Sequence, residues 1–222
     1  MQFIIYCIIN KFILNNILQF QIYCVNENIV MELKKLATIQ SGYINRGKIE
    51  PRDDGTCLLL QAKDVDAGQP SYRTDALVRF MPSLSGKDWF LKHGEILFMA
   101  RGARNFSVLM GELPENVLAA ACFFIVRVSS PEILPKYLCW YLNQLPVEEY
   151  LSRFSGRGVH MPVVRRAVLE SIDIPLPPLA IQEKVSETDK LLQIEQGLYK
   201  KLAEKRKYLI TEICLRAIRQ SK

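Results

Sequence analysis

The chain has 222 residues, of which 49% are hydrophobic and 23% are charged. This length suits one medium domain with an appendage or two small domains, and the composition is that of a globular protein with a sizeable core. The 29 Lys and Arg residues exceed the 23 Asp and Glu residues, which gives a net charge of +6. Such a balance favours a polyanion such as nucleic acid as partner, although many proteins with this charge bind none.

Cysteine and histidine usage argues against metal chemistry. The six cysteines are scattered, most of them in apolar runs, without a C-x-x-C pair, and His93 and His160 are the only histidines in the sequence. Zinc sites and Ser-His catalysis need these residue types at defined spacings. We therefore expect reduced, buried cysteines in a cytoplasmic protein that uses no metal and no cofactor.

The first 30 residues differ from the rest of the chain. They carry two charges, Lys11 and Glu27, and the uncharged run Phe12 to Asn26 contains two Asn and two Gln before its last residue. A membrane-spanning helix needs roughly 20 mostly apolar residues, and a signal peptide needs an early positive region and a small-residue cleavage site. We expect residues 1–30 to be an atypical extension from a misassigned start, before a domain that opens at Met31. A packed element and a membrane segment are the alternatives.

The next elements are predicted from apolar spacing. Leu33, Leu36 and Ile39 have helical spacing, and Gly42 stops the pattern. Short apolar runs predict buried strands in "GTCLLLQAKDV", at Ile96–Ala100 and at Phe123–Val128.

Helical spacing returns after the third predicted strand. An amphipathic helix is predicted to start at Pro135, with Leu138, Tyr141, Leu142 and Leu145 on one face. A glycine-rich loop follows, and "VVRRAVLESIDIPLP" then predicts a short helix and a strand. Because strands and helices mix without regular βαβ alternation, we predict an α+β domain.

From Ile181 onward the sequence predicts one long helix, because it contains no proline and a single glycine, Gly197. At 1.5 Å per residue the helix would be about 60 Å long. An apolar stripe in alternating steps of four and three, interrupted at Glu195 and Arg206, indicates a coiled-coil seam that needs a partner helix. The predicted seam consists of Ile181, Val185, Leu192, Tyr199, Leu202, Leu209 and Ile213.

Three prolines immediately precede this helix, at Pro175, Pro177 and Pro178. Proline fixes φ and forces the preceding residue into an extended conformation. The segment therefore predicts a stiff strut in which Ile174, Leu176 and Leu179 dock on the domain, so that the helix leaves at a fixed angle.

"LESIDIPLPPLAIQEKV" resembles the segment that joins the target recognition domain to the conserved helix in specificity subunits of type I restriction-modification systems. Other stretches resemble that family in the same order: "LKKLATIQSGY", "LKHGEILFMARGA", "ILPKYLCWYLNQ" and "FSGRGVHMPVVRRAVLESI". The resemblance covers residues 31–222. It departs from the family at "GRGVHM", where many members carry Gly, Thr or Ser, and Gln.

The resemblance implies a target recognition domain at residues 31–174, a proline strut at 175–179 and a conserved helix at 180–222. Full-length family members hold two such domains and two helices, so this chain resembles a half-subunit. It implies a homodimer, in which two helices form an intermolecular antiparallel coiled coil that spaces two DNA half-sites. The implied partners are double-stranded DNA, methyltransferase subunits that carry S-adenosylmethionine, and a translocating restriction subunit for cleavage; the chain itself is expected to catalyse nothing.

Three loops that contain glycine offer the side chains that DNA recognition uses. Arg suits guanine and phosphate, Asn and Gln suit adenine, and glycine lets the backbone approach closely. The alternative for each loop is a solvated turn, and His160 alone is better explained as structural. The predicted DNA-contacting residues are Tyr43, Asn45, Arg46 and Lys48, then Arg101, Arg104 and Asn105, and finally Arg153, Ser155, Arg157 and His160.

Four other hypotheses stay open at this point. Asp64 and Asp66 can be viewed as a metal pair, but a capped turn is favoured because no third ligand is near. A small hydrolase lacks a nucleophile elbow such as G-x-S-x-G. A membrane-anchored adaptor would use residues 1–30 and the terminal helix, whereas we expect no membrane contact. An orphan or truncated recognition domain would have no complex of its own.

Overall fold

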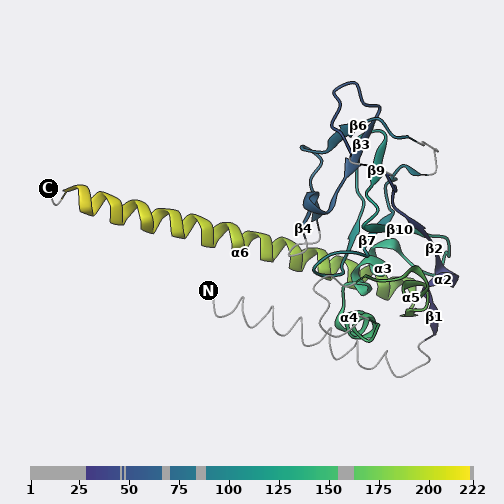
Figure 1. The fold of residues 1–222 in the computed structure, drawn as a ribbon. Coiled ribbons are helices and arrows are strands. Elements are labelled where there is room, and N and C mark those ends of the chain that lie inside the picture. Colours follow the sequence, from purple (N-terminus) through teal and green to yellow (C-terminus); the bar gives the residue numbers. More distant parts are fainter. Residues whose placement is uncertain are drawn as a thin grey trace.

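The structure is a computed structural model, and it describes residues 29–45, 47, 49–66, 71–83, 89–154 and 163–220. The described part is an α+β domain followed by one long helix that projects far beyond it (Figure 1). This matches the fold class predicted from the sequence.

A four-stranded antiparallel sheet forms the centre of the domain, in the order β2-β10-β7-β8. Two of its strands, β7 and β10, are predicted apolar runs of the sequence, and β7 is buried at all four positions. The bounds are β2 Ala37–Ser41, β7 Ile96–Met99, β8 Ser107–Leu109 and β10 Phe123–Val128.

A three-stranded sheet, β6-β3-β9, lies next to the central sheet, and a small β4-β5 pair accompanies it (Figure 1). β3 is antiparallel to β6 and parallel to β9. The bounds are β3 Cys57–Leu60, β4 Val65–Asp66, β5 Ser71–Tyr72, β6 Val78–Phe80 and β9 Val117–Ala119, with a 3-10 turn at Ala62–Asp64.

Four short helices accompany the central sheet, namely α2 Leu33–Leu36, α3 Pro135–Tyr141, α4 Leu145–Ser152 and α5 Arg166–Glu170. A large apolar cluster joins these helices to the central sheet. It includes Leu138, Leu169 and Ile174, whose exposed fraction is 0%. The predicted helix at Pro135 is confirmed at its start, but it ends at Tyr141 and α4 begins at Leu145.

The helix predicted across Leu33 to Ile39 was wrong after its first turn. α2 ends at Leu36, and Ala37–Ser41 forms β2. The reason is a switch of period, since Ala37 and Ile39 are buried while Thr38 between them is exposed. The neighbouring strand β10 then satisfies the backbone of this segment through five register pairs.

The start and the end of the domain lie side by side. β1 Val30–Glu32 pairs antiparallel with β11 Asp173–Pro175, and the Leu33 N–H donates to the Ile172 carbonyl at 2.9 Å. The long helix, α6 Leu179–Gln220, starts four residues beyond β11. Of the three residues expected to dock the proline segment, Ile174 is buried and Leu176 packs on the same cluster, but Leu179 is 45% exposed.

Candidate nucleic-acid interface

The first predicted loop begins where β2 meets the connection between β9 and β10. The Gly42 N–H donates to the Phe123 carbonyl at 2.9 Å, and the Tyr43 N–H donates to the Ala119 carbonyl at 2.7 Å. A Cβ on Gly42 would collide with the Ala120 carbonyl oxygen, so only glycine fits this crossing. The loop is therefore anchored to the residue 119–123 connection.

The second predicted loop starts at the same connection. The N–H groups of Ala100 and Arg101 both donate to the Cys122 carbonyl, at 2.8 and 3.1 Å. Arg101 also forms an isolated β-bridge with Val163, and the Val164 N–H donates to the Ala100 carbonyl at 2.9 Å. The structure thus brings together the bases of the first and second loops and the segment that follows the third.

Within the second loop, the predicted residues have different surroundings. The side chains of Arg101 and Arg104 are exposed, and neither forms an ion pair with a carboxylate in the described ranges. The Asn105 Nδ2 donates to the Met99 carbonyl at 2.7 Å, so this amide closes the loop. The two arginines are therefore the groups of this loop that are available to a ligand.

In the first loop, the structure gives Tyr43 a packing role. Its side chain is 5% exposed, and its ring centroid lies 5.6 Å from that of Phe80. Its hydroxyl accepts a hydrogen bond from the Ser83 N–H at 3.0 Å. Asn45 closes a turn by donating to the Gly47 carbonyl at 3.0 Å. The predicted contacts Arg46 and Lys48 lie outside the described residues.

The third loop is described only at its start. Arg153 is exposed and caps the C-terminal end of α4. Ser155, Arg157 and His160 lie outside the described residues, so their assignment stays a prediction.

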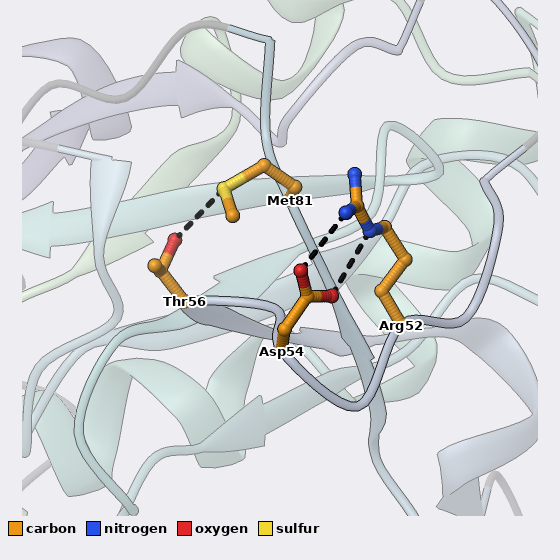
Figure 2. Close-up of polar contacts among 4 residues, drawn as sticks. All are labelled: Arg52, Asp54, Thr56 and Met81. Carbon is orange, nitrogen blue, oxygen red and sulfur yellow. Dashed lines mark hydrogen bonds and ion pairs between the residues drawn. The ribbon is translucent and has the colours of Figure 1, made fainter.

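The sequence-based search for glycine loops missed an arginine at one end of the three-stranded sheet. Arg52 forms a two-pronged ion pair with Asp54, in which Nε donates to Oδ1 at 3.0 Å and Nη2 to Oδ2 at 2.9 Å (Figure 2). Beside it, the Thr56 hydroxyl donates to the sulfur of Met81 at 3.6 Å (Figure 2). Both side chains of the pair are exposed to solvent, so the ion pair restrains the Arg52 guanidinium without burying it.

Three further basic side chains are exposed around this sheet and were also missed. Lys63 belongs to the 3-10 turn, Arg73 follows β5, and Arg79 lies in β6. The Arg79 Nη1 donates to the Gly55 carbonyl at 3.2 Å. In the sequence, each of them is only a basic residue in or next to a short element. Such residues are too common to be identified as candidate contacts before the fold is known.

The Asp64 carboxylate caps a turn, as the sequence favoured. Its Oδ2 accepts from the Gln61 N–H at 2.9 Å, and the residue is 7% exposed. Across the parts of the chain that the structure describes, no group of three or more His, Cys, Asp and Glu side chains could hold a metal ion. No helix in the same ranges is long and apolar enough to cross a membrane.

The predicted helix seam divides into two parts. Val185 is 8% exposed and belongs to the apolar cluster of the domain, and Ile181 packs against that cluster. The other five predicted positions are exposed between 46% and 64%. The first two turns of α6 therefore attach it to its own domain, and the later positions are the ones available to a partner.

One side of the projecting helix is apolar and exposed. We call it the apolar stripe, and it consists of Leu191, Leu198, Leu202, Leu209 and Ile213. Their steps of seven and four residues place them on one face. Leu191 and Leu198 were not in the predicted seam, although the neighbouring Leu192 and Tyr199 were.

The geometry can be compared with known proteins. The HsdS subunit from Thermoanaerobacter tengcongensis matches with a TM-score of 0.54 and 19% identity, over 78% of this chain and 39% of that one. A chain from a structure of complex assembly and conformational transition of the type I R-M system matches with a TM-score of 0.57 and 19% identity, over 79% and 41% of the two chains. The type I restriction-modification S subunit from M. genitalium gives a TM-score of 0.49 and 13% identity, over 75% and 39%.

No protein-family model matches this chain, and no curated protein matches it. The chain spans about two fifths of the length of the structures that it matches. Over that part, its β-rich domain and long C-terminal helix have the fold of the S subunits of type I restriction-modification systems.

Proposed function

We propose that this protein is a DNA sequence-recognition subunit of a type I restriction-modification complex. The globular domain reads one DNA half-site, and α6 docks methyltransferase subunits and pairs with the α6 of a second copy. A restriction subunit joins this assembly when DNA is cleaved. The single observation that carries the proposal is the shared fold, a β-rich domain attached to a long helix whose apolar stripe is uncovered.

The loop arrangement supports DNA reading. The backbones of the first two loops are fixed to residues 119–123, while Arg101 and Arg104 extend into solvent. Such a rigid base with exposed guanidinium groups suits contacts to phosphates and guanine edges. The net charge of +6 attracts the polyanion before any specific contact forms.

The apolar stripe supports a helical partner. Its four leucines and Ile213 are 46% to 66% exposed, and they remain uncovered by the domain. Contiguous exposed apolar surface of this kind marks an interaction site. A second copy offers a stripe of the same length and spacing, and a two-fold axis lets each stripe cover the other.

Charge makes an antiparallel crossing sensitive to salt. A basic cluster, Lys200, Lys201, Lys205, Arg206 and Lys207, lies near the middle of the exposed apolar stretch. In a symmetric antiparallel pair centred there, the two basic clusters approach each other. Repulsion between them is reduced by dissolved salt, so the helix pair is expected to strengthen as ionic strength rises.

The proposal is tested by co-expressing the chain with a type I methyltransferase subunit and sequencing the modified adenines. We expect a bipartite motif whose two halves are related by symmetry, because two identical domains read it. An unmodified genome would contradict the recognition function. A bipartite motif with unrelated halves would contradict the homodimer while retaining DNA reading.

A further inference from the structure

Gln182 joins three separate segments through one buried side chain. Its Oε1 accepts a hydrogen bond from the Leu134 N–H at 2.8 Å, just before α3. Its Nε2 donates to the Glu132 carbonyl at 2.8 Å and to the Pro177 carbonyl at 2.9 Å. The residue is 0% exposed and lies in the first turn of α6.

The surroundings of this amide are otherwise apolar. Ile181 and Val185 flank it on α6, and both pack on the domain cluster that contains Ile133 and Leu138. An apolar side chain of the same size would fill the space, yet it would leave the Leu134 N–H and two carbonyls without these partners. Apolar contacts also tolerate a small rotation or slide of a helix, whereas three directed hydrogen bonds select one arrangement.

The length of the helix magnifies any change at this joint. From Ser186 to Gln220, α6 runs about 52 Å at 1.5 Å per residue. A tilt of about 5° at its base moves the far end by about 4.5 Å, which exceeds the spacing of about 3.4 Å between successive nucleotides of a DNA strand. The direction of α6 must therefore be held within a few degrees if the helix is to set a distance to the base pair.

We propose that Gln182 is a positioning residue that fixes the direction in which α6 leaves the domain, and that it thereby sets the spacing between the two half-sites. The second part rests on the proposed function, and the first part does not. The prolines stiffen the connection, and the Gln182 amide selects its angle by holding the Pro177 carbonyl against the segment before α3.

The direction of α6 can be measured by pulsed electron paramagnetic resonance. Spin-labelled unnatural amino acids at the exposed positions Thr38 and Tyr208 leave the cysteines unlabelled, and dilution into excess unlabelled chain removes distances between copies. The variants are Gln182→Glu, which keeps the shape but loses both donated bonds, and Gln182→Met, which keeps the length but loses all polarity. Gln196→Glu makes the same chemical change at an exposed position of the same helix.

We expect a narrow distance distribution in the natural protein and in Gln196→Glu, and one at least about twice as wide in both Gln182 variants. For Gln182→Glu, the distance is measured at about pH 9 and at about pH 5: the buried carboxylate donates no bond when ionised and regains one donor when protonated, so the distribution narrows at the lower pH; Gln182→Met does not respond. An unchanged width in a Gln182 variant whose near-ultraviolet circular dichroism is native would overturn the proposal. If Gln182→Glu does not fold, Gln182→Met decides the result alone.

A second measurement separates this proposal from the function on which part of it rests. In the co-expression experiment, the methyltransferase is expected to modify half-sites at more than one spacing when it is paired with Gln182→Met. If no DNA is modified in the presence of the natural chain but the distance distribution widens in the Gln182 variants, the proposed function fails and the positioning role stands. If a bipartite motif appears and Gln182→Met keeps its single spacing, the role of Gln182 in spacing fails.

Discussion

Replacing Leu209 by alanine tests whether the apolar stripe of α6 pairs with a second helix. Leu209 is 58% exposed in the single chain and is not part of the buried clusters of the domain. The change therefore leaves the domain core untouched, and alanine is at least as good a helix former as leucine. Any loss of self-association is then due to the stripe itself.

The size of the effect follows from the exposed fraction of this side chain. Leucine to alanine removes three carbons, worth up to about 2.4 kcal/mol at about 0.8 kcal/mol for each buried group. With 58% of the residue still exposed, about 1.4 kcal/mol per chain is gained only on pairing. A symmetric pair contains the change twice, so the loss is about 2.8 kcal/mol, or about 100-fold in the dissociation constant.

Sedimentation equilibrium over a range of chain concentrations measures this constant. The matched control is Ile218→Ala, because Ile218 is 66% exposed but lies nine residues beyond Leu209, on the opposite side of the helix. We expect the control to change the dissociation constant by less than about threefold. Equal effects of the two substitutions, or a natural chain that stays monomeric at micromolar concentration, would refute the pairing argument.

Four further outcomes are expected. Arg101→Ala weakens binding to the modified motif by about 1–3 kcal/mol in fluorescence anisotropy, and unchanged affinity would remove this residue from the contact set. The dissociation constant of the self-associated chain falls as sodium chloride is raised from about 50 to about 500 mM, because salt screens the basic cluster of α6; a rise would contradict a crossing at which the two basic clusters approach each other. Burial raises the pKa of the Cys139 thiol to about 12, so at pH 8 a thiol reagent is expected to modify the exposed Cys214 quickly and Cys139 only after unfolding. Desolvation raises the pKa of Asp189, so ionisation of this carboxyl group destabilises the fold as the pH rises through its folded pKa. Asp189→Asn is therefore expected to unfold at a higher urea concentration than the natural chain at pH 7, and at the same urea concentration at about pH 3.

Long apolar runs made the central elements predictable. The strands β3, β7 and β10 and the helix α6 were each expected from the sequence, because continuous burial or a sustained helical period leaves an unmistakable pattern. The two- and three-residue strands β4, β5 and β6 carry too few side chains to show any period. The segment Ala37–Ser41 was misassigned because Ile39 lies three residues after Leu36, as it would in a continuing helix. This single apolar residue does not distinguish a helix from the strand that forms there.

The positions of the candidate loops were predictable from the sequence, but not which of their side chains are exposed. A tyrosine after glycine suggested a surface contact, yet Tyr43 lies against Phe80 because Gly42 lets the chain pass close to residue 120. The seam at Ile181 and Val185 was assigned to a partner helix, and it is their own domain that covers them. Periodicity reveals that a face is apolar, but it contains no information about which object covers that face.

The pairing of β1 with β11 also determines how the domain bears mechanical load. A pull along α6 reaches the domain through residues 173–182, where the β1 hydrogen bonds and the Gln182 amide resist it. The first described strand of the domain, β1, pairs with β11 in this region. The two ends of the domain are therefore held together by hydrogen bonds. The loops fixed at residues 119–123 lie outside this path. Tension applied to the helix is therefore carried without passing through those loops.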